Sequence, residues 1–352
     1  MKKKPKINVL VLGPEFYGYT RSIGKAFEML GAKVSCIEYD LFFSVGTIKI
    51  RRSDIPVLGS ISERSALQGF RETAIAHVRS RPIDLILIVR PDRINSETLA
   101  RLRDICPNTF ICAWFLDPWL RYPLSDQAVL FYDAVFFYDR SDLISQGGRI
   151  RNAFSLPAAF DHLEFNYAPG ALEKRYEFCF IGSLNPSRTE LIARLYEHLA
   201  HGPRSVWVSV GKRRTAKGLL RALASRESRH MRFPVRYVDS IGRDAAGVYN
   251  SSTACLNNHQ AGTKEGLNPR VFEIPGSGGV QVCDAVSGIE NYFEPDREII
   301  LYSSWEELLM KYDRLKSDKK LRNRVARAGS RRAHAEHTFK HRMSEVRDIL
   351  FK

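Results

Sequence analysis

The residues best suited to chemistry lie in one stretch of the 352-residue chain, from Asn257 to Asp284. Within it, Glu265 and Glu273 are separated by seven residues, and Arg270 stands between them. Carboxylates accept hydrogen bonds from hydroxyl groups, and arginine presents a rigid fork of donors that matches phosphate oxygens. Two glutamates at this spacing also occur by chance in many chains. The interpretation therefore depends on the segment that surrounds them.

A short helix beginning near Asn268 or Pro269 would organise these side chains. Proline is well tolerated in the first turn of a helix, and Glu273 would lie one turn inside, where it could accept hydrogen bonds from ribose hydroxyls. The helix N-terminus offers unpaired N–H groups and the positive end of the helix dipole, which suits a diphosphate. Glu265 would lie in the preceding loop, beside the phosphate and the sugar. An ordinary loop, helix and strand is the alternative.

Alternating strands and helices are predicted on both sides of this segment. Apolar runs rich in Val, Ile and Phe, without polar alternation, are typical of a parallel sheet covered on both faces. We expect strands at 7–12, 33–39, 84–89, 109–116, 134–138, 178–181, 205–210, 235–238, 253–256 and 279–282. We expect helices at 16–31, 63–81, 96–106 (with Ser96 as N-cap), 188–200, 215–230, 305–315 and 319–336. The expected fold class is α/β, with two doubly wound halves joined near Pro157–Pro169.

Motifs that are missing disfavour several classes of protein. The sequence has no G-x-G-x-x-G after a strand, no P-loop, no H-E-x-x-H and no G-x-S-x-G. Nicotinamide-dependent dehydrogenases, P-loop nucleotidases, zinc proteases and α/β-hydrolases are therefore disfavoured. No Asp-x-Asp pair is present, so we expect no bound metal. Six scattered cysteines without a C-x-x-C pair, no signal peptide and no long apolar run indicate a reduced, cytoplasmic chain.

Positive charge is concentrated in two segments. The chain carries 54 Lys and Arg against 39 Asp and Glu, a formal net charge of +15. Residues 203–236 hold ten Lys or Arg and one Glu. Residues 311–352 hold fourteen Lys or Arg and five Asp or Glu. A one-signed field steers anionic partners toward a surface, so peripheral association with the anionic inner face of a membrane is one expectation. Nucleic acid is a second, and solvated helix faces are the alternative to both.

The segment that contains Glu265 and Glu273 resembles the corresponding segment of a known family. Asn268-x-Arg270-x-Phe272-Glu273, followed by Gly278-Gly279 and Asp284, resembles the CgeB-like glycosyltransferases. These are similar to the large group of two-domain retaining transferases with a Glu-x7-Glu motif. The likeness extends over roughly residues 80–350, through Phe115–Trp119, Ser155–Ala159, Phe180–Leu184 with Arg188, and Ala326–Arg342.

The resemblance implies a GT-B fold, in which two Rossmann-like domains face each other across a central cleft. Residues 1–160 would form the acceptor-side domain and 170–335 the nucleotide-sugar-binding domain, with a helix in 336–352 crossing back to the first. The chain would be an enzyme that moves a sugar from a nucleoside diphosphate donor to a hydroxyl acceptor, a protein or a glycan, with retention and without a metal. No cofactor is expected besides that donor substrate.

The resemblance also assigns roles to single residues. Asp117, Glu265 and His259 are the catalytic candidates. Asp117 could instead cap a turn, and His259 could be structural.

The candidates for binding the donor share positions in turns or at the ends of elements. Gly13 could instead belong to a simple turn, and Arg188 could face solvent. The set is Gly13, Gly182, Arg188, Asn268, Arg270, Glu273, Gly278 and Gly279. The aromatic residues Trp114, Trp119 and Tyr122 could stack on a sugar, although a place in the core is the simpler expectation. A nucleic-acid-binding protein, or a transferase for modified DNA, remains the alternative function.

Overall fold

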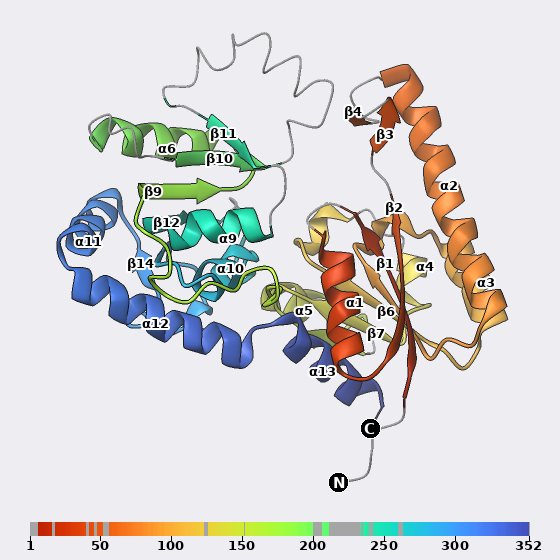
Figure 1. Cartoon of the computed structure of the whole chain (residues 1–352). Helices are drawn as coiled ribbons and strands as arrows, with labels where there is room; N and C mark the ends of the chain where they lie inside the picture. The colour runs from red at the N-terminus through yellow and green to blue at the C-terminus, as the bar shows by residue number, and fades with distance from the viewer. Residues whose placement is uncertain are drawn as a thin grey trace.

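The computed structural model describes residues 6–15, 18–39, 42–45, 48–51, 56–122, 126–150, 152–199, 206–210, 233, 235–238, 242–259 and 263–351. Two six-stranded sheets, each entirely parallel, form the centres of two domains that lie side by side (Figure 1). The predicted helix at 215–230 lies outside the described residues, as does most of the basic segment 203–236.

The first sheet has the strand order β2-β1-β5-β6-β7-β8. Its strands are β1 (Asn8–Pro14), β2 (Lys33–Tyr39), β5 (Leu85–Val89), β6 (Phe110–Phe115), β7 (Ala134–Phe137) and β8 (Ala153–Ser155). An antiparallel hairpin of β3 (Phe42–Val45) and β4 (Ile48–Arg51) follows β2. The helices are α1 (Tyr19–Met29), α2 (Pro56–Ser80), α3 (Ser96–Ile105), α4 (Asp126–Val129) and α5 (Arg140–Gln146), with 3-10 turns η3 (Pro91–Arg93) and η4 (Trp119–Arg121).

The second sheet has the order β11-β10-β9-β12-β13-β14, which is the 3-2-1-4-5-6 order of a Rossmann domain. Its strands are β9 (Tyr176–Ile181), β10 (Val206–Val210), β11 (Val235–Val238), β12 (Ser252–Asn257), β13 (Gln281–Asp284) and β14 (Ile300–Tyr302). The helices are α6 (Pro186–His198), α9 (Arg243–Asn250), α10 (Arg270–Gly276), α11 (Trp305–Ser317) and α12 (Lys319–Glu336), with the turn η5 (Ile289–Asn291). The last helix, α13 (Phe339–Leu350), packs on the first domain.

The predicted elements that fall on described residues are present. Most ends are shifted by a few residues, but α2 begins at Pro56 and not at the predicted Glu63. The sequence missed the hairpin, the three-residue strands β8 and β14 and the short helices α4, α5 and α9, which are too short to give a clear pattern. One predicted cap is wrong. The N-cap of α3 is Asn95, whose side chain accepts a hydrogen bond from the Thr98 N–H at 3.1 Å, and Ser96 is the first helical residue.

Both faces of the first sheet are buried, which explains the continuous apolar runs of its strands. In β5, Leu85, Leu87 and Val89 face α1 and α13, and Ile86 and Ile88 face α2 and α3. Because both sets of side chains are buried, no polar alternation remains to mark the strands as half exposed.

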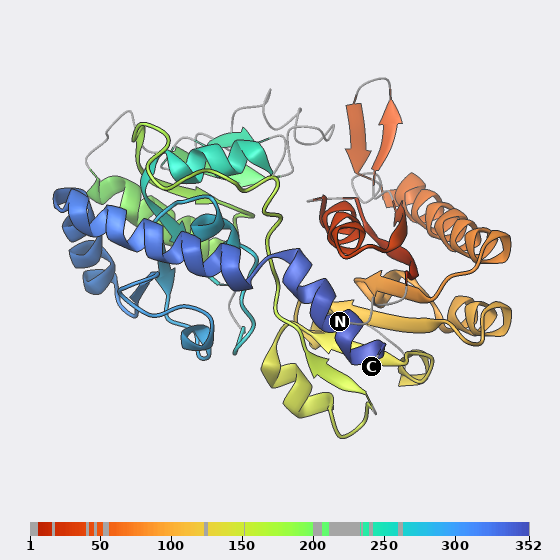
Figure 2. The same ribbon diagram turned by 60° about the horizontal axis from the view of Figure 1, so that its bottom comes forward.

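The chain passes between the domains twice, and the two crossings are bonded to each other. Phe160 of the first crossing pairs with Thr338 of the second, and the Phe339 N–H donates to the Phe160 carbonyl at 3.1 Å. The buried Arg342 side chain donates from Nε to the Pro157 carbonyl at 3.2 Å. Figure 2 shows α12 ending at the second domain and α13 continuing onto the first. There Phe339, Met343 and Val346 pack into the same core cluster as α1.

Many cations of the basic segment 311–352 are already engaged within the protein. Lys311 pairs with Asp296 and Glu307, and Lys316 pairs with Glu177. Among the described residues, no helix has the length and apolar character needed to cross a membrane. Association with an anionic membrane stays a prediction.

The docking of α13 makes a stability prediction. Met343→Ala removes a fully buried side chain from the core that α13 shares with the first sheet. We expect the free energy of unfolding to fall by about 2–5 kcal/mol, measured by urea denaturation. Lys340→Ala, at an exposed position of the same helix, should change it by less than about 0.5 kcal/mol. Equal effects of the two substitutions would contradict this packing.

Candidate active site

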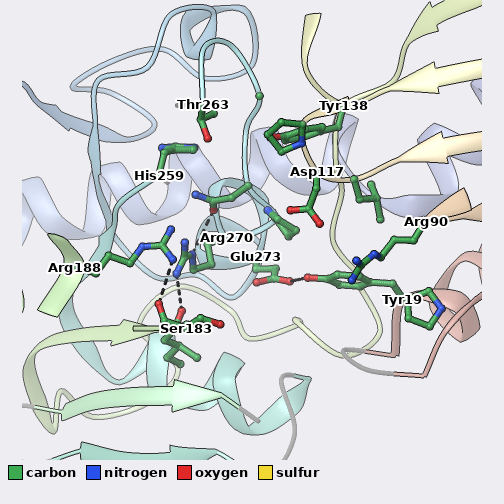
Figure 3. A pocket seen from close by; sticks show the side chains of 18 of the residues that line it. Tyr19, Arg90, Asp117, Tyr138, Ser183, Arg188, His259, Thr263, Arg270 and Glu273 are labelled. Carbon is green, nitrogen blue, oxygen red and sulfur yellow. Dashed lines mark hydrogen bonds between the residues drawn. The ribbon is translucent and has the colours of Figure 1, made fainter. Parts of the chain in front are cut away.

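A cavity lies where the carboxyl ends of both sheets meet (Figure 3). In each sheet the strand order reverses beside the first strand, between β1 and β5 and between β9 and β12. Open α/β sheets bind ligands at such switch points, because the loops there diverge to opposite faces and leave a crevice. Pro14 and Arg90 follow from the first pair of strands, and Gly182 and His259 from the second. All four line the cavity.

Two arginines converge on one backbone oxygen in the second domain. Arg188 from α6 and Arg270 from α10 donate to the Asn258 carbonyl, with N–O distances of 2.7 and 3.2 Å. Arg188 also donates to the Ser183 carbonyl at 3.1 Å, and Arg270 to the Ile181 carbonyl at 3.0 Å. Arg188 is only 3% exposed, so the alternative that it faces solvent is wrong. The cavity thus has two positioned cations at the ends of β9 and β12.

Gly182 has a structural reason to be glycine. A Cβ atom there would collide with Nη1 of Arg270. Gly182 lines the cavity. The group that packs directly against it is the Arg270 guanidinium.

The predicted helix begins where expected, but most N–H groups at its N-terminus already donate to backbone carbonyls. α10 is seven residues long, and the N–H groups of Val271, Phe272 and Glu273 donate to the carbonyls of Asn268 and Pro269. Fewer N–H groups are therefore left to bind a diphosphate than we expected from the sequence. The arginines are the better-placed partners of negative charge. Asn268 lines the cavity, and its side chain donates to Asn257 Oδ1 at 3.0 Å.

Glu273 lies at the base of the cavity and is 2% exposed. Burial raises the pKa of this carboxyl to about 7, against the opposing effects of Arg270 and of a hydrogen bond from Tyr19. The Tyr19 hydroxyl, from α1 of the first domain, donates to Glu273 Oε1 at 3.2 Å. No sequence pattern predicts this contact, because the two residues are 254 positions apart and meet only when the domains face each other.

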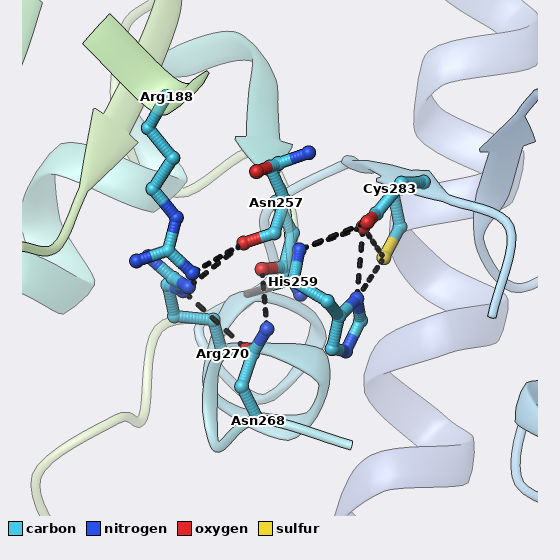
Figure 4. Close-up of polar contacts among 8 residues, drawn as sticks. Arg188, Asn257, His259, Asn268, Arg270 and Cys283 are labelled. Carbon is cyan, nitrogen blue, oxygen red and sulfur yellow. Dashed lines mark hydrogen bonds and ion pairs between the residues drawn. The ribbon is translucent and has the colours of Figure 1, made fainter. Parts of the chain in front are cut away.

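His259 (Figure 4) is hydrogen-bonded to Asp284, the last residue of β13. The ring Nδ1 lies 2.8 Å from Asp284 Oδ1, and the His259 backbone N–H donates to both carboxylate oxygens at 3.0 and 2.9 Å. Cys283 Sγ lies 3.9 Å from Nδ1. Burial would raise the pKa of Asp284, but the hydrogen bonds with His259 outweigh it and lower the pKa below its ordinary value.

His259, Cys283 and Asp284 are also a group whose ligand atoms lie within 4.8 Å of one another. Two ligands of a tetrahedral zinc ion, each about 2.0–2.2 Å from the metal, lie about 3.3 Å apart. The 2.8 Å between Nδ1 and Oδ1 is shorter and is the length of a hydrogen bond. As placed, these side chains form a hydrogen-bonded dyad with a neighbouring thiol.

The first domain supplies the opposite wall of the cavity. Asp117 follows β6, and its carboxylate lies 3.4 Å from both Arg121 Nη1 and the Tyr122 hydroxyl. Arg90 follows β5 with a φ of 57°, a left-handed conformation that costs energy for a residue other than glycine. Neither Arg90 nor Tyr138, which also lines this wall, was identified from the sequence. A strained backbone is visible only in the structure.

Several predicted site residues lie away from the lining of this cavity. Gly13 packs against Thr20 and Val89. Gly278, with a φ of 67°, packs against Tyr167 and Pro169 of the linker, and Gly279 lies against backbone atoms at the end of α10. Tight packing accounts for these three glycines.

Glu265 is half-buried in the loop before α10 and is not among the residues that line the cavity. The aromatic residues proposed to stack on a sugar lie in the core. Trp114 is fully buried and donates to the Leu156 carbonyl at 3.0 Å. Trp119 and Tyr122 pack on Phe115, with ring centroids 5.0 Å away in each case.

Comparison with protein families agrees with this geometry. Residues 208–348 match the family model described as "Glycosyl transferase-like". This range holds β12, α10 and β13, and hence the His259, Arg270, Glu273 and Asp284 side chains. No curated protein matches the chain. The predicted CgeB-like subgroup stays a prediction.

Solved structures of several glycosyltransferases are similar over nearly the whole chain. Each of those named here is covered to 99%, and each covers 98% of this chain. They include sucrose-phosphate synthase from Thermosynechococcus elongatus (14% identity, TM-score 0.66), starch synthase IV from Arabidopsis thaliana bound to ADP and acarbose (10%, 0.65), and HepE from Anabaena in complex with UDP and glucose (13%, 0.60). Identities this low show the fold alone. That fold is GT-B, as the sequence predicted.

The raised pKa of Glu273 makes stability depend on pH. The pKa of about 7 means that the folded state holds this proton up to about pH 7, whereas the unfolded carboxyl loses it near its ordinary pKa of 4.5. The wild type should therefore lose stability relative to Glu273→Gln as pH rises from about 4.5 to 7, by about 3 kcal/mol at ~1.4 kcal/mol per pKa unit. Urea denaturation of both proteins at pH 5 and pH 8 measures the difference. Glu265→Gln serves as the control, and a difference that does not change with pH would contradict the assignment.

Proposed function

We propose that this protein is a glycosyltransferase that moves a sugar from a nucleoside diphosphate donor to a hydroxyl group, with retention of configuration and without a metal. One observation carries the proposal. A single cavity at the switch points of both sheets is lined by two arginines and a buried glutamate on one side and by Asp117 on the other. The family match and the GT-B fold support it. They do not favour a nucleic-acid-binding protein.

The second domain would hold the donor. Arg188 and Arg270 are fixed by backbone carbonyls, so they need little reorganisation to face a diphosphate. The Arg270 guanidinium has five N–H donors, and three of them donate to the Asn268 side chain and to the Ile181 and Asn258 carbonyls. Glu273, at the base of the cavity, would accept hydrogen bonds from the ribose. Glu265 in the loop before α10 would approach the sugar or phosphate after a local movement.

In the reaction, the bond between the sugar C1 and the phosphate oxygen breaks, and its electron pair stays on the departing phosphate. The acceptor hydroxyl oxygen bonds to C1 on the same face, and its proton passes to that phosphate oxygen. The protein stabilises the separated charges, the phosphate through the arginines and the positively charged sugar through a carboxylate. Asp117, which lines the cavity on the side of the first domain, would take the latter role.

The acceptor would enter from the first domain, along Arg90, Asp117 and Tyr138. We propose a protein or glycan hydroxyl as its chemical class. Peripheral association with an anionic membrane, through cations of the two basic segments, would bring the enzyme to such an acceptor.

The donor site can be tested with a panel of UDP-, GDP- and ADP-sugars, with release of the nucleoside diphosphate as the readout. The wild type should release one of the three. Glu273→Ala should lower kcat/KM for that donor by about 10- to 100-fold, because hydrogen bonds to a charged group contribute about 1.5–3 kcal/mol. Glu290→Ala, at an exposed position, is the control. Unchanged turnover in Glu273→Ala would remove the glutamate from the donor site.

A second test concerns metals. Turnover should persist in excess EDTA, because cations of the chain itself face the leaving diphosphate and the sequence has no Asp-x-Asp pair. The rate after chelation and after adding back Mg²⁺, Mn²⁺ or Zn²⁺ is the measurement. Complete loss in EDTA, restored by one of these ions, would contradict the metal-independent mechanism and the hydrogen-bonded interpretation of the His259 cluster.

A further inference from the structure

We propose that His259 contacts the diphosphate of the donor through Nε2, and that Asp284 is the positioning residue that orients the ring and balances its charge. The inference rests on the proposed function, since it requires a nucleoside diphosphate in the cavity. It assigns a role to the pair His259 and Asp284 that the proposed reaction does not otherwise use.

The orientation of the ring is determined by two bonds to one carboxylate. Asp284 accepts the His259 backbone N–H at 2.9 Å and faces Nδ1 at 2.8 Å. Both residues lie at the carboxyl ends of neighbouring parallel strands, β12 and β13, so the sheet itself holds them in register. With Nδ1 bound to the carboxylate, Nε2 is the ring nitrogen left for a ligand.

Nε2 lies in the right place for such a contact. The His259 side chain is 3% exposed, and Nε2 is buried and has no hydrogen-bond partner within the described structure. The residue nevertheless lines the cavity. A buried polar atom that stays unpaired in the empty protein is stabilised when a ligand supplies the missing bond.

The neighbouring groups indicate that this ligand is anionic. Asn258, the residue before His259, accepts hydrogen bonds from both Arg188 and Arg270, and all three side chains, those of the two arginines and of His259, line the same cavity. Phosphate oxygens accept hydrogen bonds and do not donate them. Nε2 must therefore carry a proton, and the ring, which already shares a proton with Asp284, becomes an imidazolium.

Charges around the ring permit this second proton. On β13, Asp284 is anionic, and burial raises the pKa of the Cys283 thiol well above its ordinary value. On β14, burial likewise raises the pKa of Tyr302, so both of these groups are neutral at pH 7. The cations are Arg188 on α6 and Arg270 on α10, and Glu273 on α10 titrates near pH 7. The diphosphate supplies the negative charge that offsets Arg188, Arg270 and the His259 imidazolium.

The test compares nucleoside diphosphates with nucleosides by titration calorimetry at pH 7, using UDP and uridine, GDP and guanosine, and ADP and adenosine. His259→Asn is the main variant, because its amide N–H lies near the position of Nδ1 and keeps a partner for Asp284, while Nε2 is removed. It should weaken binding of the preferred diphosphate at least 10-fold and leave the matching nucleoside within 2-fold of wild type.

Asp284→Asn tests the positioning role, because it keeps a hydrogen-bonding side chain and removes the charge. It should also weaken diphosphate binding, by about 5-fold or more, and have no further effect in the His259→Asn background. Cys283→Ala is the matched control from the same cluster and should bind within 2-fold of wild type.

Each result decides between the two proposals. A wild type that binds none of the three diphosphates overturns the proposed function and this inference with it. If the wild type binds one and His259→Asn binds it equally well, only the inference is overturned. Equal weakening of nucleoside and diphosphate would make His259 structural. An undiminished effect of Asp284→Asn in the His259→Asn background would remove Asp284 from the proposal.

Discussion

The cavity depends on how one guanidinium is held. Arg270 donates to the Ile181 carbonyl at the end of β9 and to the Asn258 carbonyl at the end of β12, and so bridges the switch point of the second sheet. Because Arg270 opens α10, these bonds also determine where the helix starts and hence where Glu273 lies. Gly182 is required because a larger residue would displace the guanidinium. A conformation built from backbone carbonyls positions positive charge without neutralising it by a carboxylate, which leaves the charge available to a ligand.

The second constraint is the double connection between the domains. The crossings near Phe160 and Thr338 are paired, and Arg342 bonds the second to Pro157 of the first. α13 then packs into the core of the first domain. The two domains are therefore connected by two interdomain segments that are hydrogen-bonded to each other, and not by one flexible linker. Tyr19 and Glu273 meet across the cavity at 3.2 Å, so any relative motion of the domains would alter a contact inside the site.

Much of the site could be predicted from one segment of sequence. Asn268, Arg270 and Glu273 were identified together, and the structure brings them together because they share a loop and a short helix. Arg188, Asp117 and His259 also line the cavity, since each follows the carboxyl end of a parallel strand, β9, β6 or β12. The glycines at 13, 278 and 279 were predicted to bind the donor, but they lie away from the lining of the cavity. Glycine is found both where the protein packs tightly and where a ligand approaches the backbone, and the sequence does not distinguish the two.

The sequence by itself determined the α/β class, the ends of most elements and the presence of two halves, because apolar periodicity and turn residues act over a few positions. Tertiary structure decided which residues meet. Tyr19 reaches Glu273, Asp284 orients His259, and Arg90 has a left-handed backbone that no sequence pattern indicates. These contacts join positions far apart in the chain or depend on the strand order. No local pattern encodes them, because the energy that places these side chains comes from the packing of whole domains.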